Sequence, residues 1–472
     1  MSGARKGILA LAILVLVAAG IYYGIRVNRY LESLAPGRVP AWAKGRTVIT
    51  VWCGWVGEEQ QYFQVAIDLF NRTQKDVFVR SISTVEDDTK LFRAISAGVP
   101  PDLCILWDSS YVGTLAATGA IQPLDDFFGQ SSLKLEDFIP AGLAAGRYED
   151  HLYSLPFLID VACLFWSEQT FQEAGLRLDP GPQTLGELDD YIERLVKFDQ
   201  RGRLERLGFE PPDPDVCMAI WGARFYDPAN HRIACDEPRA IEALKWRMHV
   251  LDLQGGAEKV AAFQAGFGNF DSPQHQFFHG LVAMEPYGEW WPNYVQRFGP
   301  HVRYRIGPWP YPDKYPELKG RAYFGGNFVC MPTGSKHPRE AWRFMEWMHT
   351  EKAQVVFADK MQGCPDIKAI AQRMVPTPEE VQRANRIFVD PSLPFDEQQR
   401  LADPIRQVRY GTACQIALSP RWAVFPPLPV NILYKRELLA AFQYAERGTK
   451  TPEQALKDCQ RRVQAALKEY LR

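Results

Sequence analysis

Residues 47–52 read TVITVW, an apolar and β-branched run that no charge interrupts. Such a run is typical of a strand buried on both faces of a parallel sheet. Residues 58–71 follow at once, with Phe63, Ile67 and Phe70 at the spacing of one helix face. A buried strand followed directly by a helix predicts a βαβ unit, and therefore an α/β fold.

The same alternation continues along the chain. Strands are predicted at 76–81 and 103–107, and helices at 89–97 and 111–118. In parallel sheets ligands bind beyond the carboxyl ends of the strands. The residues predicted at those ends are Trp52, Gly54 and Trp55 after the first strand, and Trp107 and Asp108 after the third. The sequence therefore predicts a binding site lined by aromatic rings and a carboxylate.

A second lobe is predicted to begin near Pro156. After this point strands are expected at 161–166, 280–285 and 325–330, and helices at 169–174, 184–197, 238–253, 337–357 and 430–447. The last helix has a clear start, with Thr451 as N-cap, Pro452 at the first helical position and Gln454 three residues after the cap.

Composition limits the possible classes. The chain has 472 residues, 46% hydrophobic and 23% charged, which is ordinary for a globular protein of two or three domains. The formal net charge of −2 lacks the basic excess of a nucleic-acid-binding protein, so no nucleic acid is expected as a partner. The nine cysteines form no CxxC and are expected to be small buried residues. If the protein is exported one pair could oxidise, and the sequence does not select which.

Residues 7–25 contain no charge and are long enough to span a membrane. A cleavable signal peptide is the alternative, since Arg5 and Lys6 precede the apolar run. Tyr22 and Tyr23 at its end favour an uncleaved anchor, and no cysteine near position 20 offers a lipid attachment site. Residues 1–45 are thus predicted to be a signal or transmembrane helix with a proline-containing linker at 35–40.

From residue 47 to the C-terminus the chain resembles the extracellular solute-binding proteins of family 1, the maltose-binding-protein-like receptors of ABC importers. The resemblance depends on the order of several motifs along the chain. They are TVITVW at 47–52, AGVPPD at 97–102, GAIQPLD at 119–125, YSLPF at 153–157, FWSE at 165–168, GLVAM at 280–284 with Gly288-Glu289-Trp290, GGNF at 325–328 and MPTGSKHPREAW at 331–342.

The resemblance implies a two-lobe periplasmic-binding-protein-like fold of type II with a hinge near 156–160 and a return crossing near 308–312. It implies lobe 1 at 46–157 plus 311–365 and lobe 2 at 158–310 plus 366–472. It also implies capture of a carbohydrate or polyol in the periplasm, or at the outer face of the cytoplasmic membrane, and delivery to ABC permease subunits. No cofactor and no metal are expected.

The resemblance also adds candidate ligand contacts to those at the strand ends. These are Asp160, Tyr287, Glu289, Trp290, Gly326, Asn327 and Trp422. Alternatives stay open: Trp52 and Trp107 could cap the core, and Trp291 could replace Trp290 as the ligand stacker. Asp108 and Glu289 could each take part in a salt bridge across the cleft mouth instead of contacting the ligand.

Two other functions are weaker alternatives. A glycosidase needs two carboxylates across the scissile bond, and Asp108, Asp160 and Glu289 are the candidates. No GxSxG, P-loop, HExxH or dinucleotide-binding motif supports an enzyme, so no catalytic residue is predicted. His275 and His279 are four apart but lack the glutamate of a zinc motif, which favours structural roles for both. A membrane-tethered ligand sensor is the remaining alternative.

Overall fold

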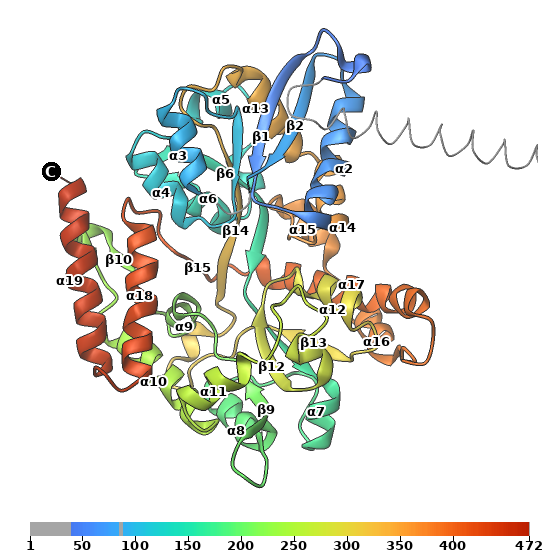
Figure 1. The fold of residues 1–472 in the computed structure, drawn as a ribbon, viewed down its shortest axis with the longest axis vertical. Coiled ribbons are helices and arrows are strands. Elements are labelled where there is room, and N and C mark those ends of the chain that lie inside the picture. The colour runs from blue at the N-terminus through green and yellow to red at the C-terminus, as the bar shows by residue number, and fades with distance from the viewer. Residues whose placement is uncertain (1–38, 85–87, 472) are drawn as a thin grey trace, which may run out of the picture.

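Two mixed α/β lobes lie one above the other in the computed structural model, which describes residues 39–84 and 88–471 (Figure 1). The predicted membrane segment at 7–25 lies outside the described residues. Within the described ranges, no helix has both the length and the apolarity that a membrane crossing requires.

The sheet of the first lobe has the order β15-β14-β3-β1-β2, and β6 pairs with β14. Its strands are β1 (Thr47–Cys53), β2 (Val77–Ser83), β3 (Leu103–Leu106), β6 (Ser154–Val161), β14 (Ala322–Cys330) and β15 (Trp422–Val424). β1 pairs in parallel with both β2 and β3, which confirms the predicted βαβ alternation. β14 runs antiparallel to β3 and β6, so the sheet is mixed.

Helices pack on both faces of this sheet. They are α2 (Gly57–Thr73), α3 (Asp88–Ser96), α4 (Ser110–Ala117), α5 (Asp125–Phe128), α6 (Pro140–Ala145), α13 (Pro338–Met348) and α14 (Glu351–Lys360). The prediction of one helix over 337–357 is wrong, because the first helix ends at Met348 and a second begins at Glu351. There the Thr350 hydroxyl accepts a hydrogen bond from the Ala353 N–H and starts α14 as its N-cap.

The second lobe has a sheet of order β13-β7-β12-β9-β8. Its strands are β7 (Cys163–Ser167), β8 (Lys197–Phe198), β9 (Leu204–Phe209), β12 (Val282–Tyr287) and β13 (Tyr304–Gly307). The single strand predicted at 161–166 is two strands, because the chain leaves the first sheet at Val161 and enters the second at Cys163. Ala162 is therefore the crossing point between the lobes.

Helices also surround the second sheet. They are α7 (Glu168–Glu173), α8 (Leu185–Leu195), α9 (Pro214–Ile220), α10 (Pro238–Leu253), α11 (Ala257–Gln264), α12 (Trp291–Phe298), α15 (Lys368–Met374), α16 (Pro378–Arg386), α17 (Phe395–Ala417), α18 (Asn431–Glu446) and α19 (Pro452–Tyr470). The hairpins β4 (Arg147–Tyr148) with β5 (His151–Leu152), and β10 (Tyr226–Asp227) with β11 (Arg232–Ile233), complete the strands. Short 3-10 turns lie at Ala41–Ala43, Leu135–Asp137, Pro228–Asn230, Gln276–His279 and Pro316–Leu318.

The chain crosses between the lobes more than once. It returns from β13 to the first sheet between Gly307 and Ala322, and residues 422–424 add the edge strand β15 to that sheet. This edge strand lies in the stretch assigned to lobe 2 from the sequence. Helix α18, the last but one, then packs against α4 of the first lobe and α9 of the second, at the side of the molecule in Figure 1.

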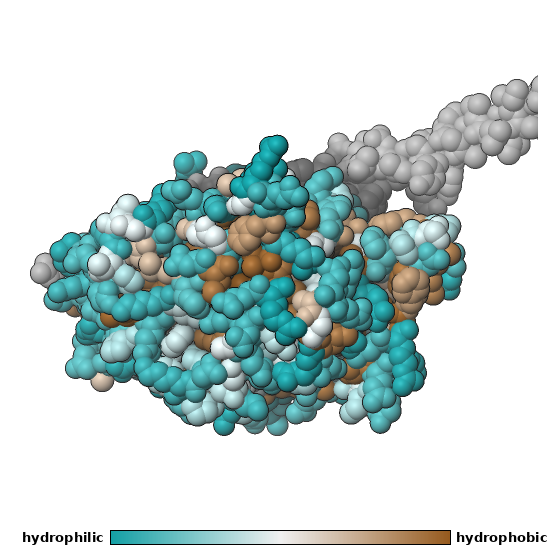
Figure 2. Space-filling model, turned by 90° about the horizontal axis from the view of Figure 1, so that it is seen from below, coloured by the Kyte–Doolittle hydropathy of each residue, from teal (hydrophilic) through white to brown (hydrophobic). Residues whose placement is uncertain are grey.

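Polar residues cover most of the face seen from below, and apolar ones gather in recesses between them (Figure 2). All nine cysteines are buried, as the apolar runs around them predict, and none forms a disulfide bond. The predicted start of the last helix is confirmed, because the Thr451 hydroxyl accepts a hydrogen bond from the Gln454 N–H.

Candidate functional site

A cavity of about 260 Å³ lies between the two lobes. Both lobes contribute to it, through the ends of β1, β3 and β6, helices α2 and α12, and the turn after β12. Its lining residues are Trp55, Glu59, Tyr62, Trp107, Leu158, Asp160, Phe270, Glu289, Trp290, Asn293, Tyr294, Asn327, Lys360, Met361 and Gly363. Six of the twelve predicted site residues are among them: Trp55, Trp107, Asp160, Glu289, Trp290 and Asn327.

Two carboxyl groups meet in this cavity. Asp160 lies near the end of β6, and Glu289 follows β12 with its side chain fully buried. Glu289 Oε2 accepts a hydrogen bond from the Val161 N–H at 2.9 Å, and Oε1 has no hydrogen-bond partner among the described residues.

Burial makes both carboxyl groups harder to ionise. It raises the pKa of Asp160 to about 6, and burial together with the Asp160 charge raises the pKa of Glu289 well above its ordinary value. In its protonated form a carboxyl group can donate as well as accept hydrogen bonds. Sugar hydroxyls need both kinds of partner.

Aromatic rings form the walls of the cavity. Trp55 and Trp107 come from the first lobe, and Trp290 comes from the second. A Cβ atom at Gly54 would lie 2.3 Å from the Trp107 ring, so the absence of a side chain there lets the indole rest on the backbone. Gly54 thus positions Trp107 without itself lining the cavity.

Trp290 and Trp291 differ in their surroundings. Trp290 is partly exposed, with its ring centre 5.2 Å from Phe270 and 5.7 Å from Tyr294. Trp291 has 0% exposure and stacks on Tyr287 at 4.4 Å in the core of the second lobe. Of the two, only Trp290 can offer a face to a ligand.

Two side-chain contacts join the lobes across the cavity. The Tyr294 hydroxyl in α12 donates to Glu59 Oε1 in α2 at 2.8 Å. Next to it, Arg297 Nη1 lies 3.1 Å from Glu58 Oε2. The structure therefore represents a conformation in which the lobes have approached each other.

Asp108 does not line the cavity. Its Oδ2 lies 2.6 Å from Lys435 Nζ in α18, and the same ammonium lies 3.4 Å from Asp215 Oδ2 in α9. Because Asp108 belongs to the first lobe and Asp215 to the second, this geometry matches the open alternative of an interlobe salt bridge. Its Oδ1 accepts a hydrogen bond from the Ser110 N–H at the start of α4.

The other predicted residues outside the cavity have structural surroundings. Trp52 packs against the apolar cluster around β3 and α4, and Trp422 packs beside β14 at the edge of the first sheet. Tyr287 contacts Trp291 and His275. Gly326 has φ +131°, and a Cβ there would lie 2.5 Å from the Leu158 carbonyl oxygen, so this glycine permits the irregular β6–β14 pairing that presents Asn327.

Several lining residues were missed from the sequence. Glu59 and Tyr62 lie three apart on the first turns of α2, Asn293 and Tyr294 lie on α12, and Phe270 comes from an irregular loop. A usable signal existed only for α2, because a helix that follows a ligand-binding strand end presents its first turn to the same site.

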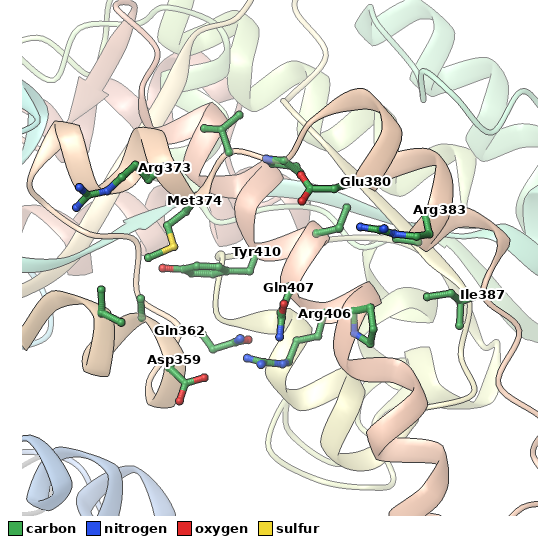
Figure 3. Close-up of a pocket in the computed structure, with 17 residues that line it drawn as sticks. Asp359, Gln362, Arg373, Met374, Glu380, Arg383, Ile387, Arg406, Gln407 and Tyr410 are labelled. Atoms are coloured by element: carbon green, nitrogen blue, oxygen red, sulfur yellow. The ribbon is translucent and has the colours of Figure 1, made fainter. Parts of the chain in front are cut away.

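A second cavity, of about 560 Å³, lies among α14, α15, α16 and α17 (Figure 3). It is larger than the interlobe cavity but contains none of the predicted residues. Tyr410 is its one aromatic lining residue, and Arg373, Arg383 and Arg406 bring cations to its wall. None of its lining residues lies at a strand end of either sheet. We therefore assign the functional site to the interlobe cavity, which the strand ends line.

The histidines four apart in sequence do not act together. His279 is exposed and its Nε2 lies 3.1 Å from the Pro273 carbonyl oxygen, whereas His275 is buried. Among the described residues, one cluster has the composition of a metal site: Glu210, His275 and Glu285, away from the interlobe cavity lining.

Residues 66–388 match the family described as bacterial extracellular solute-binding protein. The alpha-glucosides-binding periplasmic protein AglE of Rhizobium meliloti is 29% identical over 268 residues, which is 52% of this chain and 57% of AglE. The sn-glycerol-3-phosphate-binding periplasmic protein UgpB of Pectobacterium atrosepticum is 25% identical over 33% of this chain and 36% of its own length. The chain thus spans little more than half of AglE and about a third of UgpB.

Solved structures agree with the described fold. The structure of CpMnBP1 with mannotriose bound has a TM-score of 0.72 and 27% identity, and the match covers 89% of this chain and all of that one. The maltose/maltodextrin-binding domain MalE from Bdellovibrio bacteriovorus, bound to maltotriose, has a TM-score of 0.64 and 16% identity over 89% of this chain and 100% of its own, which shows a shared fold.

Proposed function

Because the chain belongs to the bacterial extracellular solute-binding proteins, we propose that it captures a neutral oligosaccharide between its lobes and delivers it to an ABC importer. The single observation that carries this proposal is the composition of the interlobe cavity. Three indole rings, two tyrosines and the carboxyl groups of Asp160 and Glu289 surround a volume of about 260 Å³. Indole faces suit the C–H faces of sugars, and buried carboxyl groups bind their hydroxyls.

The charge of the cavity favours a neutral ligand over a phosphorylated one. Lys360 is the one cationic residue among its described lining residues, against the carboxyl groups of Glu59, Asp160 and Glu289. A phosphate is usually held by arginine forks or several donors. Of the relatives' ligands, the alpha-glucosides of AglE and the mannotriose of CpMnBP1 therefore suit this cavity better than the glycerol phosphate of UgpB.

Binding without chemical change follows from the arrangement of the carboxyl groups. A glycosidase places its two carboxyl groups on opposite sides of the scissile bond, roughly 5–10 Å apart. The charge of Asp160 instead raises the pKa of Glu289, so these two carboxyl groups lie close together rather than across a scissile bond. Asp108, the third candidate, is neutralised by Lys435 outside the cavity.

The experiment is a thermal-shift and calorimetric screen of the purified protein with mannobiose, mannotriose, maltotriose and sn-glycerol 3-phosphate. A ligand that binds only the native state stabilises it by about 2.7 kcal/mol at one hundred times its Kd. We expect a neutral di- or trisaccharide to raise the melting temperature and to be recovered unchanged. Binding of sn-glycerol 3-phosphate but of none of the sugars would contradict the neutral-ligand proposal. Recovery of a hydrolysed sugar would contradict the proposal that the protein is a receptor and not an enzyme.

The proposal extends to the anchor and the hinge. The uncharged segment at 7–25 would hold the receptor at the outer face of the cytoplasmic membrane. The receptor would then lie in the periplasm, as the periplasmic proteins AglE and UgpB do. The lobes would keep the bounds expected from the sequence, except that residues 422–424 join the first lobe. They would close on the ligand about the crossings at Ala162 and 308–321. N-terminal sequencing of the mature protein from membranes tests the anchor: a start after residue 19 would mean that the segment is cleaved.

A further inference from the structure

Strand register brings two glutamates together in the second lobe. β9 and β12 are parallel neighbours with Phe209 opposite Met284, so Glu210 and Glu285 occupy adjacent positions just beyond that pair. The Glu210 N–H donates to the Met284 carbonyl oxygen at 2.9 Å, which fixes this register. Like charges at adjacent positions of neighbouring strands destabilise a sheet, so this pair requires neutralisation.

No basic side chain supplies that neutralisation. Among the described residues, neither Glu210 nor Glu285 forms an ion pair with lysine or arginine. The nearest arginine that influences Glu210, Arg247, is engaged by Glu446 at 2.6 Å and by the Pro212 carbonyl oxygen.

Glu285 is the more demanding of the two carboxylates. Its side chain has 0% exposure, and neither of its oxygens has a hydrogen-bond partner among the described residues. Burial and the neighbouring Glu210 charge raise the pKa of Glu285 well above its ordinary value, and the nearby Trp291 indole N–H offsets this only in part. An unpartnered buried carboxylate costs several kcal/mol, so a cation or a proton must accompany it.

A buried imidazole completes the cluster. His275 has 3% exposure, and one ligand atom from each of Glu210, His275 and Glu285 lies within 4.8 Å of the other two. Two ligand atoms bound to one first-row metal at about 2.1 Å lie about 3–4 Å apart, so sub-ångström movements would close these three around an ion. We propose that Glu210, His275 and Glu285 form a binding site for one divalent transition-metal ion, with Zn²⁺ the best fit.

The groups around the cluster have the arrangement of a second coordination shell. His275 Nε2 lies 3.0 Å from the Tyr287 hydroxyl, and a ligating histidine commonly gives its other N–H to such a partner. Its Nδ1 accepts only a long bond, 3.3 Å, from the Phe277 N–H, which a metal at Nδ1 would replace.

The amides around Glu210 serve the same purpose. Gln264 Nε2 donates to Glu210 Oε1 at 2.9 Å, and Gln276 Nε2 donates to Oε2 at 3.2 Å. These bonds orient the carboxylate, and the half-buried position of Glu210 gives an ion a route from solvent. Imidazole with two carboxylates suits Zn²⁺ and Mn²⁺, and the two charges of the ion would balance the two carboxylates.

The site lies at the base of the turn that carries the candidate ligand contacts. Glu285 is followed by Pro286, Tyr287 and Gly288, and then by Glu289 and Trp290. A metal at Glu285 and His275 would fix the strand end from which this turn leaves. The proposed metal site goes beyond the proposed function and does not depend on it.

The first test is metal binding by the purified protein after chelation and removal of the chelator. Titration with Co²⁺ should give visible absorption bands of a low-coordinate site that saturate at one ion per chain, and Zn²⁺ should displace them. Saturating Zn²⁺ should raise the melting temperature by about 3–5 °C. No absorption bands and no shift would overturn the proposal and mean that a proton neutralises the pair.

The second test separates the cluster from adventitious surface histidines. Glu285→Gln and His275→Gln should each lower Zn²⁺ affinity about 10- to 100-fold, because each variant loses one metal-coordinating side chain. His279→Gln is the matched control, because this exposed histidine is four residues away and outside the cluster; it should bind Zn²⁺ like the unmodified chain. Binding that is lost in His279→Gln and kept in Glu285→Gln would overturn the assignment. Circular dichroism and sugar binding establish that each variant is folded.

Discussion

Trp290 and Trp291 are neighbours in the chain, but only one of them faces the interlobe cavity. We predict that Trp290→Ala weakens the free energy of oligosaccharide binding by about 1–3 kcal/mol. This value is taken by analogy from aromatic side chains that stack on the bases of nucleic acids. Its melting temperature should change little, because the ring is partly exposed. Isothermal titration calorimetry and a melting curve on the same sample measure both quantities.

Trp291→Ala is the comparison for that variant. Its ring is fully buried among Tyr287, Phe278 and His275, so its loss should cost about 3–5 kcal/mol of unfolding free energy. Normal affinity with a collapsed melting temperature in Trp290→Ala would mean that Trp290 is a core residue and not a ligand contact.

The carboxyl pair predicts a pH dependence of stability. The pKa of Asp160 is raised in the folded state to about 6, whereas an unfolded aspartate titrates near 4. The native state therefore binds the proton more tightly, so stability should fall as pH rises from about 4 to about 6, by roughly 1–3 kcal/mol from this group. Denaturant titrations across that range measure the slope, and Asp160→Asn should flatten it. An equal slope in the variant would assign the effect to other groups.

At the scale of secondary-structure elements, local patterns were a good guide and the junctions were not. The run at 47–52 and the helical spacing at 58–71 depend only on neighbouring residues, and both elements form. The predicted helix at 337–357 fails at Thr350, where a hydroxyl cap competes with apolar spacing that continues on both sides. The strand at 161–166 fails because Val161 and Cys163 join different sheets, a choice made by residues far away in the sequence.

The candidate site shows the same division. Trp55 and Trp107 lie directly after parallel strands, so strand direction was enough to predict their place. Glu289 and Trp290 follow β12, but it was the family resemblance that predicted them. Tyr294 and Phe270 reach the cavity only because α12 and the loop before Gln276–His279 pack around it. Asp108 looked equivalent to the others until Lys435, more than three hundred residues later, was placed beside it.

The contact between α2 and α12 yields a prediction about closure. Tyr294→Phe removes the hydrogen bond to Glu59 that joins the lobes at 2.8 Å, and leaves a half-buried carboxylate without that donor. Loss of such a bond costs about 1–3 kcal/mol, and only in the closed form, so ligand affinity should fall about 5- to 100-fold. Calorimetry measures it. Tyr191→Phe in α8, away from the cavity, is the control and should keep its affinity; unchanged affinity in Tyr294→Phe would mean that this bond does not stabilise the bound form.

For the whole molecule, we predict that ligand closes the lobes. Each lobe supplies part of the cavity lining, so full contact with a sugar requires both, and hinge motion is the usual means. Small-angle scattering of the purified protein should show a smaller radius of gyration at saturating ligand. An unchanged profile at saturation would indicate lobes that are held together in both states, for example by the Asp108–Lys435–Asp215 bridge.

The strand order also sets a sequence of events during synthesis. Every strand of the second sheet comes from the continuous stretch 163–307, whereas the first sheet has β14 in its interior and β15 at its edge, from residues 322–330 and 422–424. The lobe that begins first along the chain therefore cannot complete its sheet until the ribosome has passed residue 424. Its exposed β3 edge must wait for β14, and long-range pairing of this kind is slow. A nascent chain whose first sheet is incomplete for so long can still pass through a translocation channel, which requires an unfolded chain.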